Sequence, residues 1–169
     1  MAIYDCFQYF NEEHIAELRF SILDKYVDKF VIVESTVNHQ GKPKKLQFDV
    51  NNYKKFKEKI IYIIVDDTPD EIKKTHKGGE SLVEQHQRNS IMKGLTKAHD
   101  DDLIILSDSD EIPDLTKLSE INHKKKYIAF CQKMFMYKLN LQNLNESNWI
   151  GSKITKVKYL KSMQELRNM

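Results

Sequence analysis

The hydrophobic pattern of the chain predicts strands that alternate with helices. Five short, mainly apolar runs are typical of β-strands, and they occupy residues 3–7, 30–34, 60–65, 103–106 and 127–131. The run at 30–34 is rich in β-branched residues, which indicates a strand that is buried on both faces of a parallel sheet. The strands therefore predict one buried sheet at the centre of the protein.

Apolar residues at helical spacing predict a helix directly after the first strand. We expect Asn11 to cap this helix at its N-terminus. Its core-facing stripe is predicted to consist of Ile15, Leu18, Ile22, Leu23 and Tyr26.

Two further helices are predicted before the fourth strand. A short one is expected around residues 53–60. Residues 68–80 contain Pro and Gly without an apolar period, which indicates a mobile loop that could close over a ligand. Beyond it, Ser81 and Glu84 form a capping box. The helix after this box has an apolar stripe of Val83, Ile91, Leu95 and Ala98.

Strands and helices that alternate in units of roughly thirty residues predict an α/β protein with a parallel sheet and right-handed crossovers. The chain has 169 residues, which is enough for one globular core, so we expect a single domain over residues 1–169. In such sheets, ligands bind outside the carboxyl ends of the strands. Functional side chains are therefore expected at that edge.

Charge and composition narrow the class of partner. The chain carries 27 Lys and Arg against 25 Asp and Glu, a net charge of +2. Tight binding to nucleic acid needs a concentrated basic face, so nucleic acid is not expected as the main partner. Only Arg19, Arg88 and Arg167 are arginines. Each of them is of interest, because the planar guanidinium makes contacts that Lys cannot make.

The sequence favours a cytoplasmic protein. Cys6 and Cys131 lie in apolar, strand-like runs, which predicts two buried free thiols and a reducing compartment. The N-terminal residues lead straight into a predicted strand, without the features of a signal peptide. No run approaches the 18 apolar residues of a membrane span, so no transmembrane segment is expected.

Carboxylates follow several of the predicted strands. Glu34 ends the second strand, Asp66 and Asp67 follow the third, and residues 108–111 follow the fourth with three more acidic side chains. Carboxylates crowded along one edge repel one another, so a cation or a ligand with several hydroxyl groups should compensate them. This edge is thus predicted to be a metal or sugar-nucleotide site.

Asp108 and Asp110 are the strongest candidates for chemistry. On an extended backbone, residues two apart point to the same side and can converge on one ligand. Oxygen-only ligands suit Mg²⁺ and Mn²⁺, which keep water and substrate phosphates as further ligands. The alternative is a turn in which Asp and Ser cap backbone amides. The apolar strand before the pair favours function, whereas Glu111 should point away and is expected to be structural.

Other candidate residues leave alternatives open. Arg88 lies beside the apolar stripe of its helix, so it could pair with Glu84 or bind a ligand phosphate. The six histidines show no metal-ligand spacing. No Gly-rich phosphate loop is present, which argues against Rossmann dehydrogenases and P-loop NTPases.

Five blocks of residues follow one another in a fixed order along the chain. They are Tyr4-Asp5-Cys6-Phe7 with Phe10-Asn11-Glu12, Asp28-Lys29-Phe30-Val31-Ile32-Val33-Glu34, Gly41-Lys42-Pro43-Lys44, Gln87-Arg88-Asn89 and Ser107-Asp108-Ser109-Asp110-Glu111-Ile112-Pro113. Together they resemble glycosyltransferase family 17, the family of the β-1,4-mannosyl-glycoprotein 4-β-N-acetylglucosaminyltransferase. The resemblance runs from residue 3 to about residue 113, and a weaker match continues at 149–153.

The resemblance implies a GT-A-type, Rossmann-like fold with a mostly parallel sheet flanked by helices. It implies that Asp108 and Asp110 are the catalytic, metal-binding pair: Asp110 would bind Mn²⁺ or Mg²⁺, and Asp108 would touch the ribose or a metal-bound water. Glu34 would accept hydrogen bonds from the nucleoside, and Arg88 would meet the diphosphate. Members of the family usually continue further, so the chain is expected to be short or truncated at its C-terminus.

The function implied by the resemblance is transfer of N-acetylglucosamine from UDP-N-acetylglucosamine to a hydroxyl of a glycan acceptor, with inversion. One alternative is a domain that binds a nucleotide sugar or a glycan without turnover. Another is a Mg²⁺-dependent phosphohydrolase in which one Asp attacks phosphorus. That chemistry normally places its motif after the first strand, whereas here it follows the fourth. Nothing in the sequence determines the oligomeric state.

Overall fold

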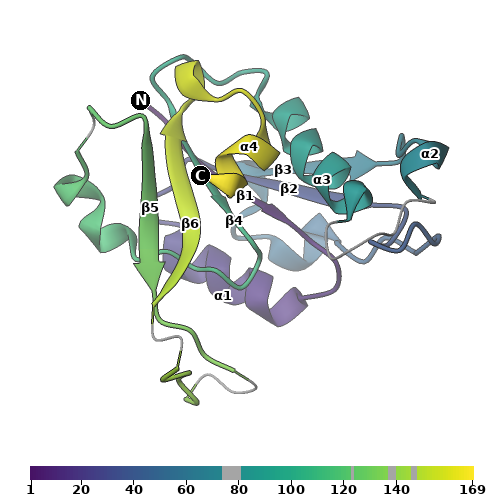
Figure 1. Ribbon diagram of the computed structural model, residues 1–169, viewed down its shortest axis with the longest axis horizontal. Helices are drawn as coiled ribbons and strands as arrows, with labels where there is room; N and C mark the ends of the chain where they lie inside the picture. The colour runs from purple at the N-terminus through teal and green to yellow at the C-terminus, as the bar shows by residue number, and fades with distance from the viewer. Residues whose placement is uncertain (74–80, 123, 137–139, 146–147) are drawn as a thin grey trace.

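A computed structural model describes residues 1–73, 81–122, 124–136, 140–145 and 148–169. Within these residues, six strands form one sheet in the order β3-β2-β1-β4-β6-β5. Helices lie on both faces of this sheet (Figure 1). The strands are β1 (Ile3–Gln8), β2 (Lys29–Ser35), β3 (Ile60–Val65), β4 (Leu103–Ser107), β5 (Tyr127–Gln132) and β6 (Trp149–Lys156).

Four strands form the parallel part of the sheet. β1 pairs in parallel with both β2 and β4, and β2 pairs in parallel with β3. β1, β2 and β4 are mostly buried on both faces, which was predicted for the run at 30–34. The predicted α/β class with a mostly parallel sheet is confirmed.

The helices fill the connections between the strands. Among the described residues, the α-helices are α1 (Glu13–Leu23), α2 (Asp70–Lys73), α3 (Leu82–Asn89) and α4 (Met163–Asn168). The 3₁₀ helices are η1 (Val50–Tyr53), η2 (Lys57–Lys59), η3 (Ser90–Leu95), η4 (Leu115–Glu120) and η5 (Val157–Tyr159). The predicted cap of α3 is present, since the Ser81 hydroxyl accepts a hydrogen bond from the Glu84 amide.

Strand order explains why helices cover both faces. The chain moves outward from β1 to β2 and β3, and then returns past β1 to β4. Right-handed crossovers in opposite directions place their helices on opposite faces. One core cluster accordingly contains α1 and the aromatic residues of the 48–56 segment, whereas the other contains η3 and α4. Side chains on one face of the sheet belong to the first cluster, and side chains on the other face belong to the second.

The β5–β6 part of the sheet departs from the parallel pattern. β6 lies between β4 and β5 and is antiparallel to both. It was not predicted, because its buried positions include Ser152, Lys153 and Thr155 alongside a single large apolar residue, Ile154. Hydrogen bonds satisfy these polar groups where apolar packing would otherwise be expected. A strand of this composition has no hydrophobic signature.

Helix α1 buries only part of the predicted stripe: Leu23 is buried as expected, but two other members are exposed. It begins after Glu12 and not after Asn11. Leu18 and Ile22 of the predicted stripe are 38% and 43% exposed, whereas the buried residues are Ala16, Arg19, Phe20 and Leu23. The physical reason is aromatic packing, because the Phe20 ring contacts a group of four rings: Phe7, Phe30, Tyr53 and Phe56.

Two smaller predictions are corrected in part. The predicted loop at 68–80 contains helix α2 at its start, and Thr68 is buried. Residues 74–80 of that segment lie outside the described residues. Cys6 is buried as predicted, but Cys131 is exposed, because it lies on β5 at the edge of the sheet.

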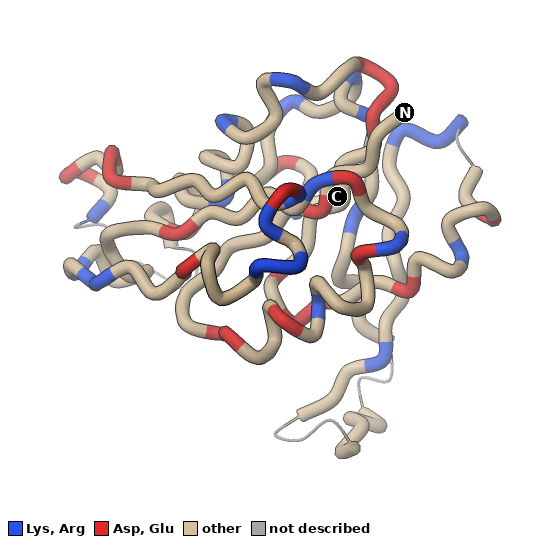
Figure 2. Tube along the Cα trace, turned by 180° about the vertical axis from the view of Figure 1, so that it is seen from behind, with Lys and Arg blue, Asp and Glu red and all other residues tan. Residues whose placement is uncertain are grey.

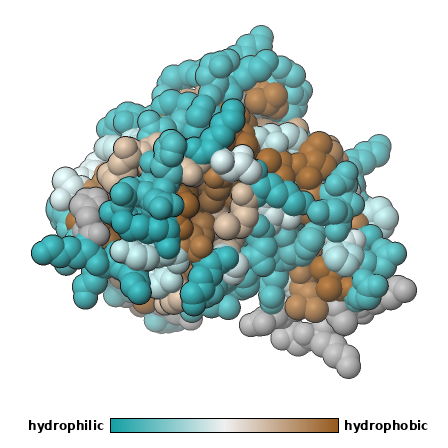
Figure 3. All heavy atoms as spheres, turned by 90° about the horizontal axis from the view of Figure 1, so that it is seen from above, coloured by the Kyte–Doolittle hydropathy of each residue, from teal (hydrophilic) through white to brown (hydrophobic). Residues whose placement is uncertain are grey.

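The surface shows mixed charge and separate apolar patches. Segments of Lys and Arg and segments of Asp and Glu are both scattered over the trace (Figure 2). Seen from above, hydrophobic residues reach the surface between larger hydrophilic areas (Figure 3). Of the helices in the described ranges, none has the length and apolar character that crossing a bilayer requires.

Candidate active site

The candidate site is built on the turn that follows β4. The amide of Glu111 donates a hydrogen bond to the Asp108 carbonyl at 3.1 Å, so residues 108–111 form a turn and not the extended segment assumed from the sequence. Asp108 and Asp110 nevertheless border one cavity. The two aspartates therefore share a cavity, although they lie on a turn and not on a strand, and their convergence on one ligand stays a prediction.

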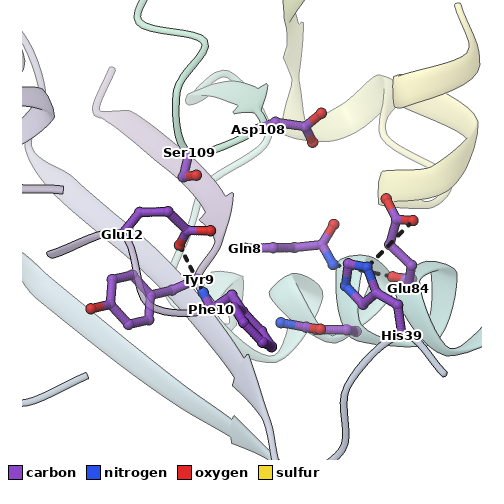
Figure 4. Close-up of a pocket in the computed structure, with 9 residues that line it drawn as sticks. Gln8, Tyr9, Phe10, Glu12, His39, Glu84, Asp108 and Ser109 are labelled. Atoms are coloured by element: carbon purple, nitrogen blue, oxygen red, sulfur yellow. Dashed lines mark hydrogen bonds and ion pairs between the residues drawn. The ribbon is translucent and has the colours of Figure 1, made fainter. Parts of the chain in front are cut away.

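Cavities lie on both sides of this turn. The strand-end cavity, of about 230 Å³, is lined by Gln8, Tyr9, Phe10, His39, Glu84 and Asp108 among others. Figure 4 shows these side chains around it, with Asp108 and Ser109 on one side and His39 with Glu84 on another. The hairpin cavity, of about 240 Å³, is lined by Asp110, Glu111, Gln132, Phe135, Trp149 and also Asp108.

The strand-end cavity lies where the strand order reverses. β2 lies on one side of β1 and β4 on the other, and the cavity is bordered by the ends of β1 and β4. In open α/β sheets this reversal leaves a crevice at the carboxyl ends of the strands, where ligands bind. The topology of the sheet and the position of the cavity therefore both indicate a ligand site at the carboxyl ends of β1 and β4.

Arg167 of α4 binds two of the acidic residues of the turn. Its Nη1 and Nη2 atoms donate to the two Glu111 carboxylate oxygens at 2.7 and 2.9 Å. Nη2 also donates to Asp108 Oδ2 at 2.7 Å. A planar guanidinium suits such paired contacts, which restrict the positions of both carboxylates. Arg167 was noted in the sequence only as one of three arginines.

Glu111 makes structural contacts, as expected, but it does not point away from the aspartates, because it lines the hairpin cavity with them and shares Arg167 with Asp108. Besides Arg167, the Asp108 amide and the Trp149 indole N–H donate to its carboxylate, at 2.9 and 2.6 Å. Burial alone would raise the pKa of Glu111, but these hydrogen bonds outweigh that effect and hold the pKa below its usual range. Glu111 is therefore an ionised link between the turn, α4 and β6.

Replacing Glu111 by glutamine should destabilise the protein at neutral pH by about 1–3 kcal/mol, because buried donors lose a charged acceptor. Since the folded-state pKa of Glu111 is depressed, its stabilising effect is fully present above the unfolded value of about 4.3. That effect is lost as the pH falls through the folded-state pKa. Urea unfolding at several pH values measures the free energy of unfolding of the parent protein and of the variant. The difference between the two should become smaller below about pH 4.

Glu120→Gln is the matched control for this prediction. Glu120 pairs with Lys117 at 3.0 Å, and its side chain is 66% exposed. An exposed pair of this kind contributes little to stability. The ionised role of Glu111 would be contradicted if the loss in the free energy of unfolding caused by Glu111→Gln did not change with pH. It would also be contradicted if that loss were no larger than the loss caused by Glu120→Gln.

Arg88 makes the ion pair that one of the two alternatives predicted. Its Nη2 is ion-paired with Glu84 one turn earlier, as the structural alternative predicted, and its Nη1 donates to Gln164. Nη2 also lies 3.7 Å from Asp108 Oδ1. The contact with a ligand diphosphate stays a prediction, since the Arg88 side chain is only 6% exposed and lines neither cavity.

The two aspartates of the turn have different surroundings. Removal of water by neighbouring groups raises the pKa of Asp108 above its usual range, although Arg167 opposes this shift. Asp110 is exposed, and no side chain in the described ranges pairs with its carboxylate. The turn therefore presents one carboxylate that is held by arginine and one that is free.

Glu34 does not lie in either cavity. Its side chain is fully buried, and it accepts hydrogen bonds from Lys44, from the Gln47 and Phe48 amides, and from the Tyr62 hydroxyl. A carboxylate without exposed surface offers no oxygen to a nucleoside. In this structure Glu34 anchors the 44–48 segment, which corrects the role expected of it at the strand end.

Asp66 and Asp67 also lie apart from the turn. Asp67 is paired with Lys93 at 2.7 Å and with His86 at 3.1 Å. Neither aspartate borders the two cavities beside the turn. The cluster of carboxylates expected along the whole sheet edge is thus reduced to the residues around β4.

Sequence reasoning missed the role of Arg19 completely. Its side chain is fully buried and pairs with the equally buried Asp5 of β1. The only signal in the sequence was the rarity of arginine in a lysine-rich chain.

The sequence profile of glycosyltransferase family 17 matches residues 1–165. A search among curated proteins found no match to the chain. The match covers nearly the whole chain of 169 residues, including β4 and the turn after it. This chain therefore belongs to glycosyltransferase family 17 and is an enzyme of glycosyl transfer.

Proposed function

We propose that the enzyme transfers N-acetylglucosamine from UDP-N-acetylglucosamine to a hydroxyl of a glycan, with inversion, and that Mn²⁺ or Mg²⁺ is required. The observation that carries this proposal is the turn after β4. There Asp108 and the unpaired Asp110 border one cavity, and Asp108 also borders the cavity at the sheet's switch point.

Charge around the turn supports a divalent cation. Glu84, Asp108 and Glu111 are paired with Arg88 or Arg167, whereas the exposed Asp110 has no ion-pair partner among the described side chains. A diphosphate would add further negative charge beside Asp110, so binding it calls for a cation.

The donor set fits Mg²⁺ or Mn²⁺ that arrives with a nucleotide. Within the described ranges, no group of three or more His, Cys, Asp or Glu side chains is arranged to hold a metal. These ions are, however, commonly bound by one or two carboxylates together with substrate phosphates and water. Asp110, with support from Asp108, would hold the ion. A bound cation would neutralise the charge that develops on the departing diphosphate.

The strand-end cavity is the proposed donor site. Phe10, which is 43% exposed, offers a ring on which a base can stack, and Gln8 and His39 offer polar atoms beside it (Figure 4). Asp108 and Ser109 line the same cavity on the side of the turn. A nucleotide bound there would direct its diphosphate toward Asp108.

The hairpin cavity is the proposed acceptor site. Trp149 and Phe135 are 38% and 43% exposed and line the cavity beside Asp110. Aromatic rings with a polar rim suit a sugar, which has apolar ring faces and hydroxyl edges. The indole N–H bond to Glu111 restricts the orientation of the Trp149 ring. Donor and acceptor would then meet across the Asp108–Asp110 turn.

Titration with UDP-N-acetylglucosamine and Mn²⁺ tests the proposed function. We expect saturable binding that is lost when the metal is chelated, followed by slow release of the sugar to water. Calorimetry measures the binding, and chromatography measures free N-acetylglucosamine. Binding without sugar release would indicate a binding domain. An absence of binding, or release of phosphate from simple esters, would refute the proposal.

A further inference from the structure

A buried arginine contacts the main chain of the turn from inside the protein core. Arg19 of α1 is fully buried, and its Nε and Nη2 atoms donate to the two carboxylate oxygens of Asp5 at 2.7 and 2.6 Å. Its Nη1 atom is directed toward three main-chain carbonyls of the turn. These are the carbonyls of Asp108 at 3.1 Å, Ser109 at 3.2 Å and Glu111 at 3.0 Å.

These contacts constrain the backbone that carries the proposed metal ligands. Three carbonyls of one short turn can converge on a single cationic group only in a narrow range of backbone conformations. Because Asp5 holds the other edge of the guanidinium, the position of Nη1 is set by strand β1 and helix α1. A second anchor, the Ser152 hydroxyl, donates to the Glu111 carbonyl at 3.1 Å.

Arg19 has no access to a ligand. It has no exposed surface and lines neither the strand-end cavity nor the hairpin cavity. Any influence that it has on the reaction must therefore pass through the turn.

We propose that Arg19 is a positioning residue: it sets the backbone conformation of residues 108–111 and so aims Asp108 and Asp110 at the metal and the diphosphate. Its effect on nucleotide binding rests on the proposed function, whereas its effect on the turn does not. Groups that orient ligating carboxylates in this way commonly change metal affinity or activity by about tenfold to a hundredfold when they are lost.

The fluorescence of Trp149 can be used to follow the conformation of this turn. Trp149 is the single tryptophan, and its indole N–H donates to Glu111 Oε1 at 2.6 Å. If the turn loosens, this contact should loosen with it. Trp149 fluorescence anisotropy should then fall, and quenching by acrylamide should rise.

Arg19→Lys is the main variant, and Lys59→Met is its matched control. A lysine at position 19 keeps the charge beside Asp5 but cannot also reach the three carbonyls of the turn. Lys59 likewise donates to two carbonyls of the α1 end, those of Asp24 and Val27, at 2.6 and 3.0 Å. It lies just before β3, at the amino end of the sheet, where the 108–111 turn is not found.

The measurements are thermal unfolding, Trp149 fluorescence without ligand, and calorimetric binding of UDP with Mn²⁺. We expect Arg19→Lys to remain folded, to change the Trp149 signals, and to weaken UDP binding about tenfold or more. Lys59→Met should lower the unfolding temperature without changing Trp149 or UDP binding.

A double variant, Asp5→Leu with Arg19→Met, covers the case in which Arg19→Lys does not fold. Buried ion pairs often tolerate apolar replacement of both partners, but this change leaves the turn without its cation. The same change in Trp149 is expected.

Unchanged Trp149 signals in a folded Arg19 variant, or equal changes in the Lys59 control, would overturn the positioning role. UDP binding as tight in a folded Arg19 variant as in the parent protein would also overturn the positioning role. If the parent protein itself binds no UDP with Mn²⁺, the proposed function is refuted. In that case the Trp149 fluorescence of the Arg19 variants still tests whether Arg19 positions the turn.

Discussion

Asp110→Asn is expected to abolish Mn²⁺-dependent binding of UDP while the fold stays intact. Asp110 is the carboxylate of the turn that is exposed and has no ion-pair partner among the described side chains, so it is the one available to a cation. Asparagine keeps the size of the side chain and removes its charge. We expect a loss of affinity of about a hundredfold or more, equivalent to about 2.7 kcal/mol. Calorimetric titration with UDP and Mn²⁺ measures it.

Asp114→Asn provides a matched control for this experiment. Asp114 is exposed, lies four residues further on, and caps η4 through a hydrogen bond from the Thr116 amide at 3.0 Å. Asparagine is as good a cap as aspartate, so the control changes net charge without disturbing structure. The metal assignment is wrong if Asp110→Asn binds UDP as tightly as the parent protein does.

Asp5→Asn is expected to cause the largest loss of stability, about 3–5 kcal/mol. Asp5 and Arg19 are both fully buried, and their oxygen and nitrogen atoms are 2.6 Å apart. Without the carboxylate, a guanidinium charge stays buried with only neutral carbonyls around it, which is strongly unfavourable. Urea unfolding monitored by circular dichroism gives the difference in the free energy of unfolding.

Asp101→Asn tests whether burial is the cause of this effect. Asp101 is ion-paired with Lys156 and Lys158 at 3.1 and 2.7 Å, but its side chain is 64% exposed. Screening by water should make its replacement nearly neutral. If Asp5→Asn and Asp101→Asn lowered the free energy of unfolding by similar amounts, burial of the Asp5–Arg19 pair would not be the cause of the effect.

Prediction from sequence succeeded where the signal was local. The strands at 3–7, 30–34 and 103–106 are mainly apolar runs, and the structure has them as the buried centre of the sheet. The cap at Ser81 depends on residues three apart and is also present. Asp108 and Asp110 could be placed at a strand end because β4 directly precedes them.

Prediction failed where polar groups are buried. β6 has no apolar period, since side chains such as Ser152 and Thr155 are buried in hydrogen bonds. The face of α1 was misjudged because Arg19 lies on its buried side. A charged residue is normally assigned to the surface, and its burial becomes favourable only when a partner such as Asp5 is in place. That partner belongs to a different element.

The amino-acid sequence by itself determined the alternation of strands and helices, the mostly parallel sheet, and an acidic pair after the fourth strand, because each of these depends on neighbouring residues. Only the tertiary structure decided how the three arginines are used. Arg19, Arg88 and Arg167 come from α1, α3 and α4, yet each of them contacts the turn after β4. Contacts between distant segments follow from how the elements pack on the sheet, and no local pattern records that packing. The same packing leaves Asp110 free and holds Asp108, a distinction that the spacing of two aspartates could not make.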